Sequence, residues 1–102
     1  MENNKHNYLN ECHLRGRVGN LFRRNGCMTE FALCTEATYS NPDGMIVVKC
    51  TWHTVRTFAP VEELKTNDWV EVVGAIDALR FADSAGKYQQ MNIIKASSVT
   101  RL

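Results

Sequence analysis

The sequence predicts an all-β domain, and two observations carry that prediction. Five segments rich in Val, Ile, Thr, Phe and Trp recur along the chain, at residues 9–18, 28–39, 45–59, 69–79 and 87–95. Turn-forming residues separate most of them, in the order Asn25-Gly26, Asn41-Pro42-Asp43-Gly44 and Asp83-Ser84-Ala85-Gly86. Strands that follow one another through such turns are expected to pair antiparallel.

The segment between the third and fourth strands is the only one with helical features. Pro60 suits a first helical turn, Glu62 and Glu63 would lie near the positive end of the helix dipole, and Asn67 is expected to end the helix in a left-handed conformation. These features predict a short helix over residues 60–65. Five strands with this helix describe the OB-fold, a partly open Greek-key barrel, with a small SH3-like barrel or an open sheet as alternatives.

Alternation along the strands predicts which side chains face the barrel interior. Two glycines inside strand patterns, Gly16 and Gly74, are expected to mark bends or close backbone approaches that let the barrel close. The expected interior positions are Phe31, Leu33, Val70, Val72, Ile76, Met91 and Ile93.

Composition limits the classes of function. The 102 residues fit one domain, with 44% apolar and 23% charged residues, as in ordinary globular proteins. We expect a flexible N-terminal arm over residues 1–8, a single domain over residues 9–102 and a cytoplasmic location without a membrane partner. The net charge of +1 excludes a strongly basic surface, so any binding of nucleic acid must use local clusters of basic residues.

The four cysteines, at positions 12, 27, 34 and 50, form no Cys-x-x-Cys pair. We expect no disulfide framework, no metal site and no cofactor. Cys34 and Cys50 lie within strand patterns, where a free thiol packs as a small apolar group.

The stretch from residue 51 to residue 58 is the most informative for function. In an extended strand, Trp52, Thr54, Arg56 and Phe58 share one face. Aromatic planes beside a fixed positive charge are suited to stacking unpaired bases and holding the phosphates that join them. His53 lies on the opposite face without a nucleophile or acid partner in a motif, so we do not expect an enzyme.

Four ordered motifs resemble the bacterial single-stranded DNA-binding protein (SSB) family. They are Leu14-Arg15-Gly16-Arg17-Val18-Gly19, Phe31-Ala32-Leu33-Cys34-Thr35, Thr51-Trp52-His53-Thr54-Val55 with Phe58, and Val70-Glu71-Val72-Val73-Gly74-Ala75-Ile76. The chain departs from the family pattern by a shorter stretch between Gly19 and Phe31 and by ending at Leu102 without an acidic tail. We therefore do not expect recruitment of replication proteins through such a tail, although replication proteins remain candidate partners.

The resemblance implies sequence-tolerant binding of single-stranded DNA in replication, recombination and repair. It also implies a homo-oligomer, commonly a tetramer, with a dimer as the alternative. The stacking positions carried over from the family are Tyr39, Trp52, Phe58 and Phe81. Our candidates for phosphate contact are Arg15, Arg17, Lys49, Arg56, Arg80 and Lys87.

Two other functions remain open at this point. One is a primosomal replication protein, a short OB-fold protein that binds single strands as a dimer and docks helicase-loading partners. The other is an OB module whose aromatic face binds a peptide or another subunit.

Overall fold

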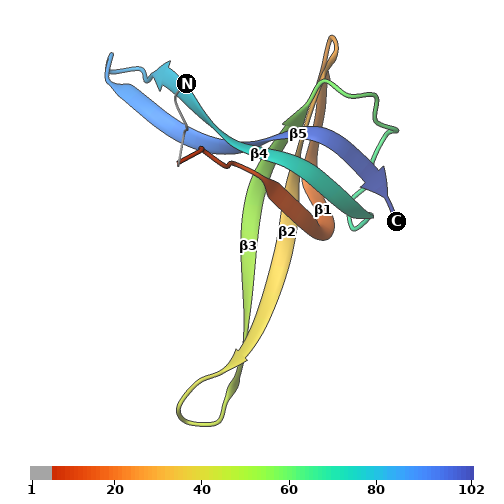
Figure 1. Ribbon diagram of the computed structural model, residues 1–102, viewed down its shortest axis with the longest axis vertical. Helices are drawn as coiled ribbons and strands as arrows, with labels where there is room; N and C mark the ends of the chain where they lie inside the picture. Colours follow the sequence, from red (N-terminus) through yellow and green to blue (C-terminus); the bar gives the residue numbers. More distant parts are fainter. Residues whose placement is uncertain (1–5) are drawn as a thin grey trace.

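Five long strands close into a barrel in the order β1-β2-β3-β5-β4 (Figure 1). The structure is a computed structural model, and it describes residues 6–102. Neighbouring strands pair antiparallel except β3 and β5, which run parallel and close the barrel. The strands are β1 (Cys12–Asn25), β2 (Met28–Ser40), β3 (Ile46–Thr57), β4 (Trp69–Ala82) and β5 (Tyr88–Arg101).

The three predicted hairpin turns are confirmed. Gly26, Gly44 and Gly86 adopt positive φ values of 62°, 80° and 80°, a region that glycine enters without steric cost. The Oδ1 atom of Asn41 accepts backbone N–H groups at 3.0 and 3.1 Å, and that of Asp83 accepts two more at 2.9 and 3.0 Å. These side-chain hydrogen bonds satisfy backbone N–H groups that have no strand partner within the turns.

Two hairpins extend well beyond the barrel as two-stranded ribbons (Figure 1). We call residues 36–50 the β2–β3 arm and residues 80–90 the β4–β5 arm. Side chains in both arms are largely exposed, whereas the parts of the same strands within the barrel contain the buried residues. The arms therefore place side chains far from the barrel core.

The core lies inside the barrel and is almost entirely aliphatic, apart from Phe31. Predicted interior positions Phe31, Leu33, Val70 and Val72 are confirmed, each with no exposed area. Leu64, from the connection between β3 and β4, completes the core cluster at 4% exposure. Burying one such aliphatic side chain contributes about 1.5–3 kcal/mol.

The interior prediction is wrong for two residues farther along the sheet. Ile76 is 51% exposed and Met91 is 38% exposed. Both lie past a bulge between Val73 and Gly74, where β4 and β5 begin to leave the barrel, so alternation no longer separates interior from exterior. Ile93 is buried as predicted, at 3% exposure, but it lies outside the core cluster.

The predicted helix over residues 60–65 is wrong, because the whole connection from residue 58 to residue 68 is irregular. Its backbone bonds to the barrel instead: Asn67 N–H donates to Val18 at 2.7 Å, and Val18 N–H donates to Asp68 at 2.9 Å. A single helical turn is costly to nucleate, and here an extended path seats Leu64 in the core. Asn67 does adopt the predicted left-handed conformation, at φ 73°, but it closes a turn.

No helix in residues 6–102 is long and apolar enough to cross a membrane.

The two strand glycines have the predicted role. A Cβ atom at Gly16 would collide with the carbonyl oxygen of Cys34, and one at Gly74 would collide with the carbonyl oxygen of Lys95. Both positions are therefore points of close backbone approach between neighbouring strands.

The prediction of free thiols at Cys34 and Cys50 is wrong. The structure joins them in a disulfide, with Cα atoms 6.3 Å apart. The register pairs Cys34 with Trp52 and Glu36 with Cys50, so the two cysteines are diagonal neighbours on one face of β2 and β3. A separation of 16 residues does not reveal this contact until the hairpin register is known.

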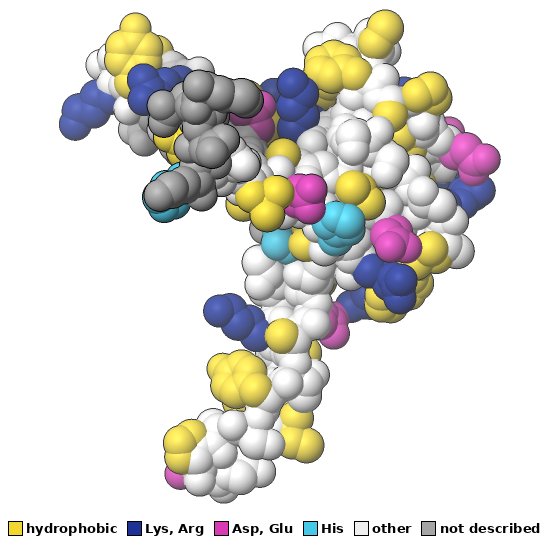
Figure 2. Space-filling model, viewed as in Figure 1, with side chains coloured by type: hydrophobic (Ala, Val, Ile, Leu, Met, Phe, Trp, Pro, Cys, Tyr) yellow, Lys and Arg dark blue, Asp and Glu magenta, His cyan; other side chains and the backbone are white. Residues whose placement is uncertain are grey.

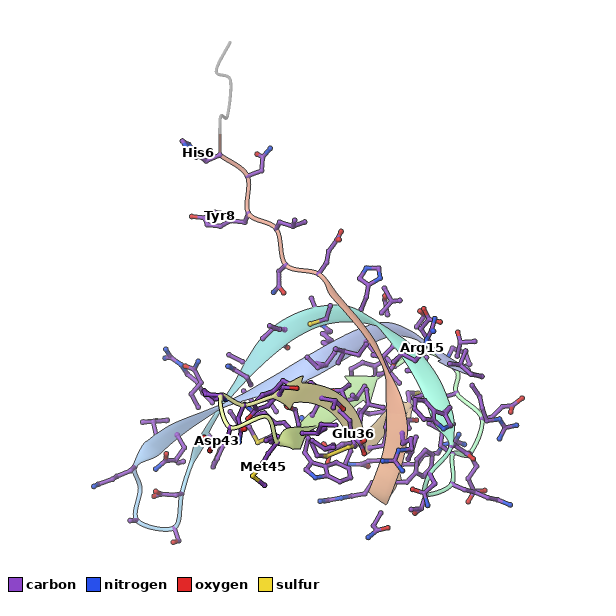
Figure 3. All side chains as sticks on the ribbon, turned by 90° about the horizontal axis from the view of Figure 1, so that it is seen from below. His6, Tyr8, Arg15, Glu36, Asp43 and Met45 are labelled. Atoms are coloured by element: carbon purple, nitrogen blue, oxygen red, sulfur yellow. A yellow bond between two sulfur atoms is a disulfide. The ribbon has the colours of Figure 1, made fainter. Side chains whose placement is uncertain are left out.

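The N-terminal segment leaves the barrel as an extended stretch. The first strand begins at Cys12 and not near residue 9, and Tyr8 projects away from the barrel (Figure 3). The Asn10 amide bonds the backbone N–H and C=O of Ile76 at 2.9 and 2.7 Å and so prolongs the pairing of β1 with β4. Most of the predicted arm over residues 1–8 lies outside the described residues.

Candidate nucleic-acid interface

The outer face of β3 carries the residues that the sequence singled out. Trp52, Thr54 and Arg56 pair in register with Cys34, Ala32 and Glu30, while Val55 between them is fully buried in the core. Trp52 is 60% exposed, and Phe58, just past the end of the strand, is 66% exposed. The predicted common face of indole, guanidinium and phenyl groups is therefore present and open to solvent.

Gly19 provides the seat for the Trp52 ring. A Cβ atom at Gly19 would lie 2.6 Å from Cζ3 and 3.1 Å from Cη2 of Trp52. Any side chain at this position would push the indole out of place, so the glycine lets the ring lie against β1 while its other side stays exposed. The sequence showed Gly19 only as part of a motif, and nothing local to it predicted this contact.

Glu30 holds Arg56 in position and was missed by sequence reasoning. Its side chain is nearly buried, and its Oε1 accepts from Arg56 Nε at 2.5 Å, while its Oε2 lies 3.9 Å from Arg23 Nε. Two hairpin registers place the three residues in a row, Arg23 opposite Glu30 and Glu30 opposite Arg56. The Asn25-Gly26 turn was the available signal, since it sets the first of these pairings.

The other two predicted arginines of the barrel also have acidic partners. Arg15 pairs with Glu71 at 3.5 Å. Arg17 pairs with Glu36, and its guanidinium lies 6.0 Å from the centre of the Trp69 ring, within the range of a cation–π contact. The three arginines of the barrel that were predicted to contact phosphate are therefore held by neighbours, and their positive charge is partly neutralised.

The remaining predicted residues lie on the arms. Tyr39 and Lys49 share the face of the β2–β3 arm opposite to that of Trp52, because Tyr39 pairs with Val47 and Lys49 with Ala37. Phe81 lies on the β4–β5 arm with Arg80 and Lys87. Figure 2 shows hydrophobic and basic side chains on both arms. The structure thus groups Trp52, Arg56 and Phe58 but separates them from two outlying sets.

The aromatic rings and cations of the arms are accessible. Tyr39 is 52% exposed and Phe81 is 48% exposed. Within residues 6–102, the side chains of Lys49, Arg80 and Lys87 take part in no ion pair. These three side chains keep their full charge for an external anion.

Two ionisable groups near these residues have structural partners. The Nε2 atom of His53 lies 2.9 Å from Thr35 Oγ1, so the imidazole is hydrogen-bonded within the hairpin. The amide of Gln89 bonds to the Asp83 carboxylate and, with the backbone N–H groups of Lys87 and Ala85, lowers the pKa of Asp83. Both groups maintain hairpin structure.

Comparison with solved structures places this barrel among known folds. The Plasmodium falciparum SSB in complex with single-stranded DNA superposes with a TM-score of 0.78, at 19% identity, over 96% of this chain and 98% of that one. The chain has the fold of single-stranded DNA-binding proteins. The five-stranded OB-fold barrel predicted from the sequence is thereby confirmed, apart from its short helix.

Two further structures agree with this assignment of the fold. The small single-stranded DNA-binding protein from Streptomyces coelicolor matches with a TM-score of 0.64 and 18% identity, over 90% of this chain and 93% of that one. A deletion mutant of the single-stranded DNA-binding protein from Thermus aquaticus matches with a TM-score of 0.71 and 15% identity. That match covers 92% of this chain and 50% of the Thermus chain.

No protein-family model matches the sequence, and a search of curated proteins finds no relative.

Proposed function

We propose that this protein binds single-stranded DNA with little dependence on sequence, by stacking bases on exposed rings and contacting phosphates with arginine and lysine. The observation that carries the proposal is the outer face of β3, where Trp52 and Phe58 are both mostly exposed with Arg56 between them. A soluble protein has little reason to leave two large rings exposed beside a guanidinium unless a partner covers them.

The chemistry of unpaired nucleotides fits this face. Every base has an apolar π-face, so stacking on Trp52 and Phe58 tolerates any sequence and contributes about 1–3 kcal/mol per base. Glu30 positions Arg56 between the two rings, where the phosphate backbone of a strand running from one ring to the other would pass. Duplex DNA hides its base faces and is expected to bind poorly.

The first experiment is a titration of tryptophan fluorescence with oligodeoxythymidine. The chain has two tryptophans, so the Trp69→Phe variant leaves Trp52 as the only reporter. We expect strong quenching by the single strand, weak quenching by a duplex and weakening by added salt. Trp52→Ala should lower the affinity about 5- to 150-fold, measured by anisotropy of a labelled oligonucleotide.

Tyr8→Ala is the matched control for Trp52→Ala, because Tyr8 is an exposed ring on the N-terminal segment, away from the barrel. Its affinity should stay close to that of the unchanged protein. If the single strand binds to neither the unchanged protein nor the control, the proposal fails.

A protein-binding role is the second candidate, and one observation favours it. Met45, Ile46 and Val48 of the β2–β3 arm are 63%, 73% and 59% exposed, an apolar surface that needs no nucleic acid to explain it. Binding of a partner through these side chains would respond little to salt, whereas binding of a single strand weakens with a log-log slope of about 0.7 per neutralised phosphate.

The proposal has further parts that follow from the sequence resemblance. The protein acts without catalysis in the cytoplasm, protecting single strands during replication, recombination and repair. It does so as a homo-oligomer, a tetramer or alternatively a dimer, which native mass measurement distinguishes.

A further inference from the structure

A pocket of about 350 Å³ opens on the outer surface beside Phe58. Its apolar walls come from four parts of the barrel: Met28 of β2, Phe58 after β3, Leu79 of β4 and Ile93 of β5. Ile93 is 3% exposed and lies outside the core cluster. The volume falls in the lower part of the range for small-molecule sites, about 300–1,000 Å³.

Charged groups of both signs line the same pocket. Arg56 and Lys95 are register partners on the parallel strands β3 and β5. Asp77 of β4 joins them, and its Oδ1 accepts the backbone N–H of Ala78 at 2.9 Å. Within residues 6–102, Asp77 forms no ion pair, in contrast to Glu30, which two arginines neutralise.

This combination suits a base better than a phosphate. Arg56 and Lys95 would attract a phosphate, but the Asp77 carboxylate beside them would repel one, whereas a base offers apolar faces to the walls and hydrogen-bond donors at its edge. The pocket is also continuous with the stacking face, because Phe58 and Arg56 belong to both. A strand stacked on Phe58 would therefore pass over the mouth of the pocket.

We propose that the pocket takes one base of the bound strand and that Asp77 selects a base with an exocyclic amino group, such as cytosine, over thymine. The cytosine N4 amino group donates to a carboxylate, while thymine has the acceptor O4 in the same place. The inference rests on the proposed single-strand binding and adds a base preference to it. Lys95 also lines the pocket, where its ammonium group would contact a carbonyl oxygen of the base or the adjoining phosphate.

The test compares oligodeoxycytidine and oligodeoxythymidine of equal length, both unstructured, by anisotropy at fixed salt. The unchanged protein should bind the cytidine strand about fivefold or more tightly than the thymidine strand. In Asp77→Asn the ratio should fall toward one, because an amide both donates and accepts. Glu63→Gln removes the same charge from the connection outside the pocket, and it should leave the ratio unchanged.

The outcomes separate this inference from the function on which it rests. Equal binding of both strands by the unchanged protein overturns the base preference while single-strand binding stands. A preference for cytidine that persists in Asp77→Asn overturns the proposed role of Asp77 in selecting the base. Failure of both strands to bind overturns the proposed function and the base preference together. Thermal melts of Asp77→Asn confirm that a changed ratio reflects recognition and not unfolding.

Discussion

The outer face of the barrel and the two arms carry the same kinds of side chain, aromatic rings and cations, in different electrostatic settings. On the barrel, Arg15, Arg17 and Arg56 each contact an acidic residue. On the arms, the side chains of Lys49, Arg80 and Lys87 form no ion pair within residues 6–102.

This difference indicates a division of labour within the proposed interface. Ion pairs on the barrel fix the positions of guanidinium groups and rings, which lowers the entropy lost when a base stacks. Unpaired cations on the arms keep their charge for phosphates and release counterions when they bind. We therefore expect the barrel to supply most of the stacking energy and the arms to supply most of the salt dependence.

The largest expected effect comes from removing the acid that holds Arg56. Glu30→Gln should destabilise the protein by about 1–3 kcal/mol, because it leaves Arg56 and Arg23 without their shared, nearly buried partner. The free energy of unfolding is measured by urea denaturation. At the same time, single-strand binding should become more dependent on salt, since Arg56 regains its full charge for a phosphate.

Glu36→Gln is the matched control, because Glu36 pairs with Arg17 at an exposed position. It should change stability by less than about 1 kcal/mol. If both variants lose the same free energy of unfolding, the buried ion pairs of Glu30 contribute no more than an exposed surface pair.

The sequence was sufficient for the parts of the fold that depend on local chemistry. Strand alternation placed Phe31 and Val72 in the core, and turn residues such as Gly44 and Asp83 located the hairpins. The common face of Trp52 and Arg56 followed from the two-residue period of a strand. All of these features are determined by residues close in sequence.

Features that depend on register between distant strands were out of reach. Arg56 lies opposite Lys95 because β3 and β5 run side by side in parallel, and no turn in the sequence predicts this strand contact. The contact of Trp52 with Gly19 depends on the register of β1 against β2, which is irregular in this region, and the exposure of Ile76 depends on where β4 leaves the barrel. The helix prediction failed for a related reason, since tertiary contacts of Leu64 outweighed weak local propensity.

A smaller effect should separate the cations of the arms from those of the barrel. Neutralising Arg80 and Lys87 together, as Gln, should reduce the log-log salt slope of single-strand binding by about 1.4, at roughly 0.7 per phosphate contact. Neutralising Arg15 and Arg17 in the same way should reduce it by less, because Glu71 and Glu36 already offset their charge. An equal or larger change in the barrel variant would contradict the proposed division.

The smallest expected effect concerns the turn at the tip of the β4–β5 arm. The hydrogen bond from Gln89, and then those from the backbone at Lys87 and Ala85, lower the pKa of Asp83 from its ordinary value of 3.8. A lowered pKa means that the carboxylate stabilises the folded hairpin above pH 3.8 and that this contribution is lost as the pH falls through the folded pKa.

Hydrogen exchange at the Lys87 amide, followed against pH, should therefore show constant protection near neutrality and a decline only in strong acid. In Asp83→Asn this decline should disappear, since an amide keeps acceptor capacity for the turn but does not titrate. Single-strand affinity at neutral pH should stay the same in Asp83→Asn, because Asp83 shapes the turn and contributes no ring or cation. A loss of affinity with the turn intact would instead place Asp83 in the interface, and the arm would then do more than hold Arg80 and Lys87 out for phosphates.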